Sequence, residues 1–307
     1  MSHSPLLHRA DPGAEVGSAV GGALAEARRF VEDFDPELVI IFGPDHYQGF
    51  RYELMPPFCI GAAAEAVGDY GTDTGPLDVP KNITDDLLRS VLQADLDVAM
   101  SERMMVDHGI SQPLEVLLGS VAARPVIPIF VNSVAAPLGP MRRARLLGEA
   151  VGQFAGSLGR RVLVVGSGGL SHDPPVPKLR TAPVDVAAYL IDKHRTAEEQ
   201  VRREEQVYEA GQSFARGDSK LRPLNPELDQ SILDLFSNGD VRRFDDFAVE
   251  WLDEQGGGSV HEVRTWVAAH AALAAVGSYR TTSTFYQPIP EWIVGFAVTT
   301  ALSTINA

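Results

Sequence analysis

Four of the eight histidines in this 307-residue sequence lie at turn-like positions beside small or acidic residues: His3 in SHSP, His46 in GPDHYQGF, His108 in VDHGISQP and His172 in GSGGLSHDPP. Imidazole is the commonest protein metal ligand and acid–base group near neutral pH. His46 and His172 each follow a predicted buried strand by a few residues, and strand ends on one edge of a sheet lie close together. For one such histidine alone, a structural role is the simpler interpretation. Several together favour imidazoles that converge on a single site.

Three of the remaining histidines carry weaker signals. His194 lies in a charge-rich segment and is expected at the surface. His270 lies in the alanine-rich run VAAHAALAAV, where a satisfied core histidine is the simpler interpretation. His8 follows two leucines and has no distinguishing neighbours.

A carboxylate could complete a metal site. Glu262 is the best candidate, because it opens a predicted helix just after the glycine run Gly256–Gly258. Two imidazoles and one carboxylate on one face of a metal leave positions open, as non-haem Fe(II) requires when it binds both substrate and O2. An acidic residue there is also favoured simply by the helix dipole. The spacing alone does not decide between these two interpretations.

Other chemistries fail on their motifs. Gly166–Ser171 (GSGGLS) departs from the dinucleotide pattern G-x-G-x-x-G at its last position, so its glycines more simply let the backbone turn and point His172 into a cleft. The sequence has neither the H-E-x-x-H motif of zinc peptidases nor a G-x-S-x-G nucleophile elbow. The single cysteine, Cys59, lies in the apolar run PPFCIGA, which is typical of a buried, inert thiol.

The elements that must position these residues follow an α/β pattern, in which short β-branched runs alternate with longer amphipathic stretches. Buried strands are predicted at Leu38–Phe42, Val126–Val131 and Arg161–Val165. Helices are predicted at Glu15–Phe34, Ile83–Ala94, Gln112–Ala122, Met141–Leu158 and from about His261 to Ala275. The charge-rich segment Asp185–Phe214 predicts a helix that faces water, and an amphipathic pattern follows from Pro223 to Phe247.

Composition narrows the class of protein. Apolar residues make up 45% of the chain, which excludes a disordered protein, and nothing marks a linker, so we expect a single domain over residues 1–307. Lys and Arg number 26 against 41 Asp and Glu, a net charge of −15 that disfavours nucleic acid as a partner. The sequence shows no signal-peptide pattern and no apolar run of the ~18 residues that span a membrane, so we expect a cytoplasmic protein.

Seven motifs together resemble the class III extradiol catechol dioxygenases, and the likeness spans nearly the whole chain. GSGGLSH and DHG are the most specific of them. The motifs are SHSPL at Ser2–Leu6, PDHYQGF at Pro44–Phe50, MPPFCIG at Met55–Gly61, VDHGISQPLE at Val106–Glu115, GSGGLSHDPPVP at Gly166–Pro177, HEVRTWVAA at His261–Ala269 and PIPEWIVGF at Pro288–Phe296.

The resemblance implies roles for six residues. They are His3, His46 and Glu262 as ligands of a mononuclear Fe(II), His108 and His172 as acid–base groups beside it, and Asp107 as the residue that orients His108. It also implies a mixed central sheet flanked by helices.

The implied reaction is cleavage of a catechol ring by O2 beside its two hydroxyls, in the catabolism of aromatic compounds. The expected substrate carries a propionate or acrylate side chain, as in 3-(2,3-dihydroxyphenyl)propionate or 2,3-dihydroxycinnamate, so an Arg or Lys should lie near the pocket. The partners expected are therefore this small molecule and O2, with no membrane, and we expect a homo-oligomer.

One departure bears on the metal site. A short strand usually precedes the SHSP histidine in this family, whereas only Met1 and Ser2 precede it here. We therefore expect either that the sequence starts late or that His3 is poorly anchored. Two competing hypotheses remain open, namely a non-catalytic protein on the same fold that has lost its metal and a zinc hydrolase that uses the same ligands.

Overall fold

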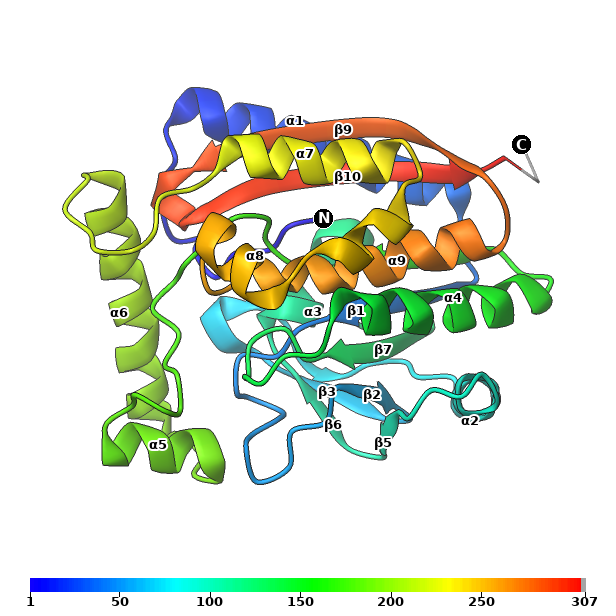
Figure 1. Cartoon of the computed structure of the whole chain (residues 1–307), viewed down its shortest axis with the longest axis horizontal. Coiled ribbons are helices and arrows are strands. Elements are labelled where there is room, and N and C mark those ends of the chain that lie inside the picture. The colour runs from blue at the N-terminus through cyan, green and yellow to red at the C-terminus, as the bar shows by residue number, and fades with distance from the viewer. Residues whose placement is uncertain (305–307) are drawn as a thin grey trace.

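The computed structural model describes residues 1–304, so the last three positions of the predicted domain 1–307 lie outside the described residues. The α-helices are α1 (Ala14–Phe34), α2 (Lys81–Gln93), α3 (His108–Leu118), α4 (Met141–Ser157), α5 (Val184–Ile191), α6 (Ala197–Ala215), α7 (Pro226–Ser237), α8 (Val249–Gly256) and α9 (Val263–Ala275). The strands are β1 (Leu38–Gly43), β2 (Phe58–Gly61), β3 (Ala64–Val67), β4 (Thr74–Pro76), β5 (Ala99–Ser101), β6 (Met104–Val106), β7 (Val126–Val131), β8 (Val162–Gly166), β9 (Tyr279–Ile289) and β10 (Val294–Ser303). Helices and strands are interspersed as far as β8, after which the helices α5 to α9 follow one another and the strands β9 and β10 end the chain's regular structure (Figure 1).

The central sheet is mixed, as the family resemblance implies. Its five strands run in the order β5-β2-β7-β1-β8, and β1 lies parallel to both β7 and β8, whereas β2 is antiparallel to β7. A second sheet has the order β4-β3-β6, and β9 and β10 form a long antiparallel pair. All three strands predicted from the sequence are present within one residue of the predicted bounds.

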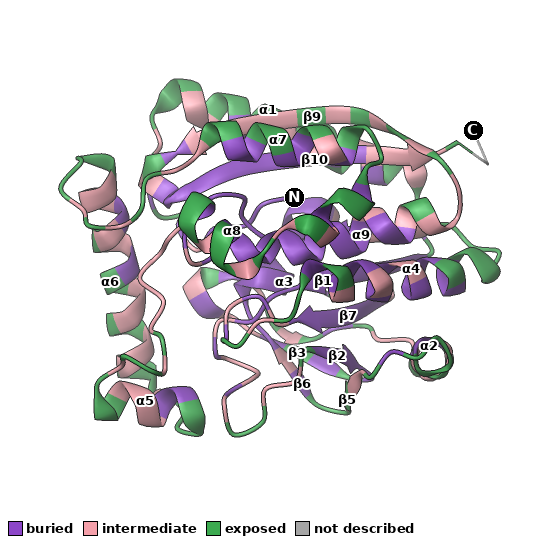
Figure 2. Ribbon diagram, viewed as in Figure 1, coloured by how far each residue is buried: buried purple, intermediate pink, exposed green. Residues whose placement is uncertain are grey.

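The two faces of β1 bury different sides of the molecule, because side chains alternate along a strand. Val39 and Ile41 join the core beneath α1 and α3. Leu38, Ile40 and Phe42 join the core beneath α2, α4 and α9. Every residue of β1 is buried (Figure 2), so the strand end that leads to His46 is fixed from both faces.

Helices α4 and α9 approach so closely that glycine is required between them. A Cβ on Gly148 would lie 2.1 Å from the carbonyl oxygen of Ala268, and one on Gly152 would lie 2.1 Å from that of Ala272. These contacts are with backbone, which cannot swing aside. The pairing fixes the helix that follows Glu262.

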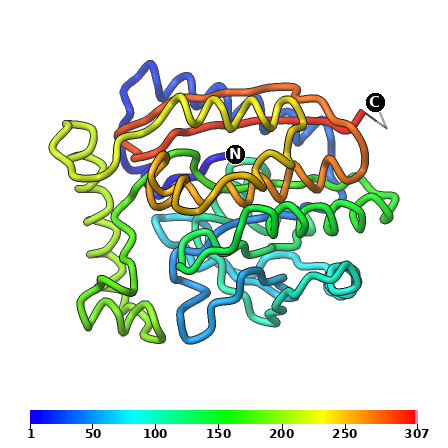
Figure 3. Tube along the Cα trace, in the orientation of Figure 1, coloured from blue at the N-terminus to red at the C-terminus, as the bar shows by residue number. Residues whose placement is uncertain are grey.

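The first residues of the chain lie beside its last strand, as the blue and red ends of the trace in Figure 3 show. The backbone N–H of Ser2 donates to the carbonyl of Ala297 in β10 at 2.7 Å, and the N–H of Gly168 donates to the carbonyl of Met1 at 3.2 Å. Met1, Ser2 and His3 are all buried. The expectation that His3 would be poorly anchored is therefore wrong, because hydrogen bonds to β10 and to the segment after β8 hold it without a strand of its own.

The charge-rich segment departs from its prediction in two ways. It forms two helices, α5 and α6, and α6 begins with a capping box in which Thr196 and Glu199 exchange hydrogen bonds. Helix α6 lies along one end of the molecule (Figure 1), and one of its faces packs inward at Val207 and Gly211. The expectation that the whole segment only faces water is wrong. Within residues 1–304, no helix is both long and apolar enough to cross a membrane.

Candidate functional site

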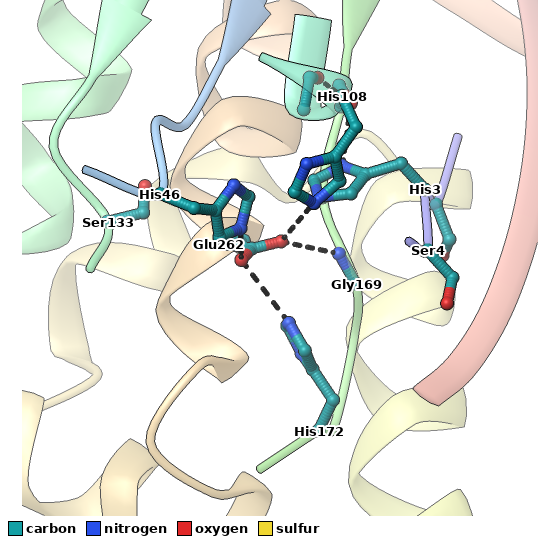
Figure 4. A network of polar contacts seen from close by, with 12 residues as sticks. His3, Ser4, His46, His108, Ser133, Gly169, His172 and Glu262 are labelled. Carbon is teal, nitrogen blue, oxygen red and sulfur yellow. Dashed lines mark hydrogen bonds and ion pairs between the residues drawn. The ribbon is translucent and has the colours of Figure 1, made fainter. Parts of the chain in front are cut away.

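Four histidines and one glutamate converge where the central sheet meets the N-terminal segment (Figure 4). His46 follows β1, His108 opens α3, His172 follows β8, and His3 arrives from the buried N-terminus. Glu262 lies at the junction of a short 3₁₀ helix (Val260–Glu262) with α9 and is fully buried. The structure thus brings together the residues that the sequence predicted would meet.

The Glu262 carboxylate is the common neighbour of three imidazoles. Its Oε1 lies 3.2 Å from Nε2 of His46 and 3.3 Å from Nε2 of His172, and its Oε2 lies 3.6 Å from Nε2 of His3. The backbone N–H of Gly169 donates to Oε2 at 3.0 Å. A Cβ on Gly168 would lie 2.6 Å from that of Glu262, so the glycines after β8 also make room for this side chain.

Hydrogen bonds at Nδ1 fix the tautomers of these rings. Nδ1 of His172 lies 3.0 Å from the Leu170 carbonyl, which can only accept. Nδ1 of His3 lies 2.9 Å from the Ser167 hydroxyl, whose single proton is donated to the Gly109 carbonyl, so this hydroxyl accepts as well. Each ring therefore carries a proton on Nδ1 and turns its Nε2 toward Glu262, which is how protein groups outside the coordination sphere prepare imidazoles for a metal.

His46 is held by the residue that the sequence assigned to another histidine. The Asp107 carboxylate accepts from the backbone N–H of His46 at 2.6 Å and lies 3.0 Å from its Nδ1, while its other oxygen caps α3 through the N–H of Gly109. The expectation that Asp107 orients His108 is therefore wrong. Tyr47, immediately after His46, has a φ of 64°, a strained conformation that turns the chain sharply at the site.

His108 is oriented by Asp69 instead. The Asp69 carboxylate accepts the backbone N–H of His108 at 2.8 Å and the ring Nδ1–H at 2.5 Å. The His108 ring stacks on that of His46 with centroids 4.4 Å apart and meets the Tyr70 ring edge-on at 4.9 Å. Tyr70, next to Asp69, also has a positive φ, of 53°.

Burial and charge together set the protonation states. Burial alone would raise the pKa of Glu262, but the facing imidazoles of His172 and His3 hold that pKa well below its usual range. Burial lowers the pKa of His3 to about 3, against the opposing charge of Glu262. Burial would also lower the pKa of His46, but the Asp107 and Glu262 carboxylates raise it well above its ordinary value.

The residues fit a metal ion. Ligand nitrogens of His3, His46 and His108 lie within 4.8 Å of one another, and the Glu262 oxygens face two of the three. Buried lone pairs that face a buried carboxylate need a proton or a cation between them, because an acceptor cannot bond an acceptor. Imidazole with carboxylate is a donor set that suits divalent iron and zinc alike.

The site opens into a cleft of about 740 Å³, a volume that includes open solvent at its mouth. All four histidines line it, together with Tyr70 and Trp292 and with residues of α6.

Residues 1–297 match the family model described as the catalytic LigB subunit of aromatic ring-opening dioxygenase. The chain belongs to the LigB family. Relatives from Rhodococcus sp and Rhodococcus jostii, both named 2,3-dihydroxyphenylpropionate/2,3-dihydroxicinnamic acid 1,2-dioxygenase, are 57% and 55% identical over 304 residues, which cover 99% of this chain and 97% of each relative. A relative of the same name from Azotobacter vinelandii is 51% identical over 302 residues, which cover 98% of this chain and 97% of the relative.

Membership of the LigB family confirms the resemblance to extradiol dioxygenases, the fold class and the expectation of an oxidoreductase that opens aromatic rings. The relatives favour neither a non-catalytic protein nor a zinc hydrolase.

The sequence did not reveal every residue at this LigB-family site. Asp69 lies in the run VGDYGT, which matches no motif and is 39 positions from its partner His108. Ser167 lies inside the GSGGLS motif, but nothing in the motif indicates that its hydroxyl would accept from His3. Only the folded chain brings these pairs together.

Proposed function

We propose that the chain is an Fe(II)-dependent extradiol dioxygenase acting on 3-(2,3-dihydroxyphenyl)propionate or 2,3-dihydroxycinnamate, with His3, His46 and Glu262 as the iron ligands. The observation that carries the proposal is the buried Glu262 carboxylate faced by the Nε2 atoms of His3 and His46. Family membership and the names of the relatives support the reaction and the substrate.

Ferrous iron bound there would supply Lewis acidity toward the catechol oxygens and electron transfer to O2. His172 would act as the base for a catechol proton, because its Nδ1–H is held by the Leu170 carbonyl and its Nε2 is turned into the site. His108 would donate a proton when the ring is cleaved. The Asp69 carboxylate beside it would compensate the positive charge that His108 carries while it holds that proton.

Partial closure of the cavity supports the same reaction. Of the four imidazoles that line it, His3, His108 and His172 are buried and His46 is half-buried, which limits the access of bulk water to the reacting groups. An excess of water would hydrate and screen the charges on which this acid–base chemistry depends.

The proposal is tested with protein purified anaerobically, stripped of metal and reloaded with Fe²⁺ or Zn²⁺. We expect O2 consumption and a coloured ring-fission product with Fe²⁺ alone, since Zn²⁺ has no redox chemistry. Equal turnover with Zn²⁺, or turnover by the metal-free protein, would refute the assignment of iron.

A further inference from the structure

Two arginines from the charge-rich segment line the cavity without a carboxylate partner. Arg195 immediately precedes the capping residue of α6, and Arg203 lies within α6. Neither forms an ion pair with any residue of the described chain 1–304, although acidic residues outnumber basic ones 41 to 26. By contrast, the buried Arg145 is paired with both Glu149 and Asp245, at 2.6 and 2.7 Å.

Arg195 is held in place from one side only. Its guanidinium carbon lies 3.7 Å from the centroid of the Tyr189 ring, and Arg51 lies 5.5 Å from the same centroid. Its other contact is a long hydrogen bond of 3.4 Å from Nη1 to Gln200. Burial lowers the pKa of Arg195, and the positive charges of Arg203 and Arg51 lower it further. The stack therefore fixes the direction of a cation whose charge nothing nearby neutralises.

Arg203 is fixed in a similar way. Its Nη2 donates to the carbonyl of Pro175 at 2.7 Å, which leaves the other guanidinium donors without a partner in the described chain. Pro174, Val176 and Val207 line the cavity beside it. Two positioned cations beside an apolar wall match a short hydrocarbon chain that ends in an anion.

Tyr70 lines the same cavity as Arg195 and Arg203 and contacts one of the histidines. Its ring meets that of His108 at 4.9 Å. Burial raises the pKa of its phenol, and the charges of Arg203 and Arg195 oppose that rise, so both cations act on a residue in contact with His108. The arginines, Tyr70 and the imidazoles thus line one cavity.

We propose that Arg195 and Arg203 together bind the carboxylate at the end of the substrate's side chain and so select acidic catechols over neutral ones. This assignment rests on the proposed ring-cleavage function. It gives the pair a role in specificity and leaves the chemistry to the histidines. A carboxylate is the ligand that two fixed guanidinium groups accept best, because each can donate two parallel hydrogen bonds to its oxygens.

The test compares two substrates that differ only in that charge, 3-(2,3-dihydroxyphenyl)propionate and 3-propylcatechol. In the Fe²⁺-loaded enzyme, Arg195→Gln and Arg203→Gln should each raise KM for the acid by about 10- to 100-fold, the range expected for a lost charge-assisted contact, with kcat little changed. Turnover of 3-propylcatechol should stay as in the parent enzyme. Arg195→Lys, which keeps the charge, should recover much of the loss.

Arg202→Gln is the matched control, because Arg202 is the exposed neighbour of Arg203 on the same helix. It should change neither substrate. Equal losses on both substrates in the Arg195 and Arg203 variants, or no loss on the acid, would overturn the proposal.

A binding measurement separates this proposal from that of ring cleavage. Calorimetry with 3-phenylpropionate, which has no hydroxyl to react, should show the same weakening in the two variants and none in Arg202→Gln. Should the parent enzyme cleave neither catechol, the ring-cleavage proposal fails, and the binding result still decides the role of the arginines. Unchanged affinity for 3-phenylpropionate in both variants would refute that role.

Discussion

Asp69→Asn tests which residue completes the metal site. Two candidate ligand sets share His3 and His46 and differ in the third member, which is Glu262 in one and His108 in the other. Asp69 contacts His108 through the backbone N–H at 2.8 Å and the ring Nδ1–H at 2.5 Å, and its side chain is 3% exposed. An asparagine keeps the shape but removes the charge, and it offers only one oxygen for the two donors.

The magnitude follows from the lost bond. A hydrogen bond to a charged group contributes about 1.5–3 kcal/mol, which corresponds to roughly 10- to 150-fold in rate if His108 needs that partner to hold the proton it donates. We therefore expect kcat for ring cleavage to fall by that factor while iron content stays at one per chain by metal analysis.

Asp107→Asn is the matched comparison, because Asp107 holds His46 in the same way that Asp69 holds His108. Loss of such a supporting carboxylate typically costs about 10- to 100-fold in metal affinity. Iron should therefore dissociate more readily from the Asp107 variant than from the Asp69 variant. If Asp69→Asn loses iron to the same degree, His108 is a ligand and our acid–base assignment is wrong.

Three further predictions concern the ligands, the helix packing and acid stability. His3→Ala should abolish stoichiometric iron binding, measured by metal analysis. His8→Ala is the control and should leave iron binding unchanged, because His8 is exposed. Iron retained by His3→Ala would exclude His3 as a ligand. Gly152→Ala should lower the free energy of unfolding, measured by urea titration, by about 1–3 kcal/mol, because the added Cβ would meet the backbone of α9. The control is Gly21→Ala in α1, whose Cβ meets nothing within 4 Å and which should be neutral or stabilising. Equal effects of the two substitutions would contradict the packing argument. Burial lowers the pKa of His270 from 6.5 to about 3, so the folded state binds fewer protons than the unfolded state between these values and stability falls as pH drops through that window. At pH 5 the loss of unfolding free energy due to His270 is about 2 kcal/mol. His270→Phe should therefore reduce the fall in unfolding free energy between pH 7 and pH 5 by that amount. If the variant and the parent lose the same free energy over this range, His270 does not cause the loss.

Strands β1, β7 and β8 and most helices were predictable because their apolar runs indicate burial, whereas the fully buried strand β2 was not predicted. Val39 and Ile41 alternate with Leu38 and Ile40 so that every position of β1 is apolar, which only a strand covered on both faces requires. The start of α3 was less predictable. It begins at His108, four residues before the predicted start, because Asp107 caps it and not because an apolar pattern begins there.

The members of the site were more predictable than their pairing. Motifs place His46 after one strand and His172 after another, and the common sheet edge then brings them together. The anchoring of His3 was not predictable, because it depends on hydrogen bonds from Met1 and Ser2 to residues 166 to 297, which no local pattern encodes. The inward face of α6 was also hidden, since alternating charges on a helix look the same whether they meet water or line a cavity.

The pairing of the two carboxylates with the two histidines shows why sequence neighbours mislead at a helix start. Asp107 and His108 are adjacent, which suggested that one orients the other. Successive side chains near a helix start point about 100° apart, so a cap residue and the next residue face different partners. Asp107 turns one oxygen to the N–H of Gly109 and the other to His46, and His108 turns away to Asp69. His46 and His108 are thus each held by a carboxylate from another part of the chain. Displacement of the segment that carries Asp69 or Asp107 would therefore change the relative position of these two rings, whose centroids lie 4.4 Å apart.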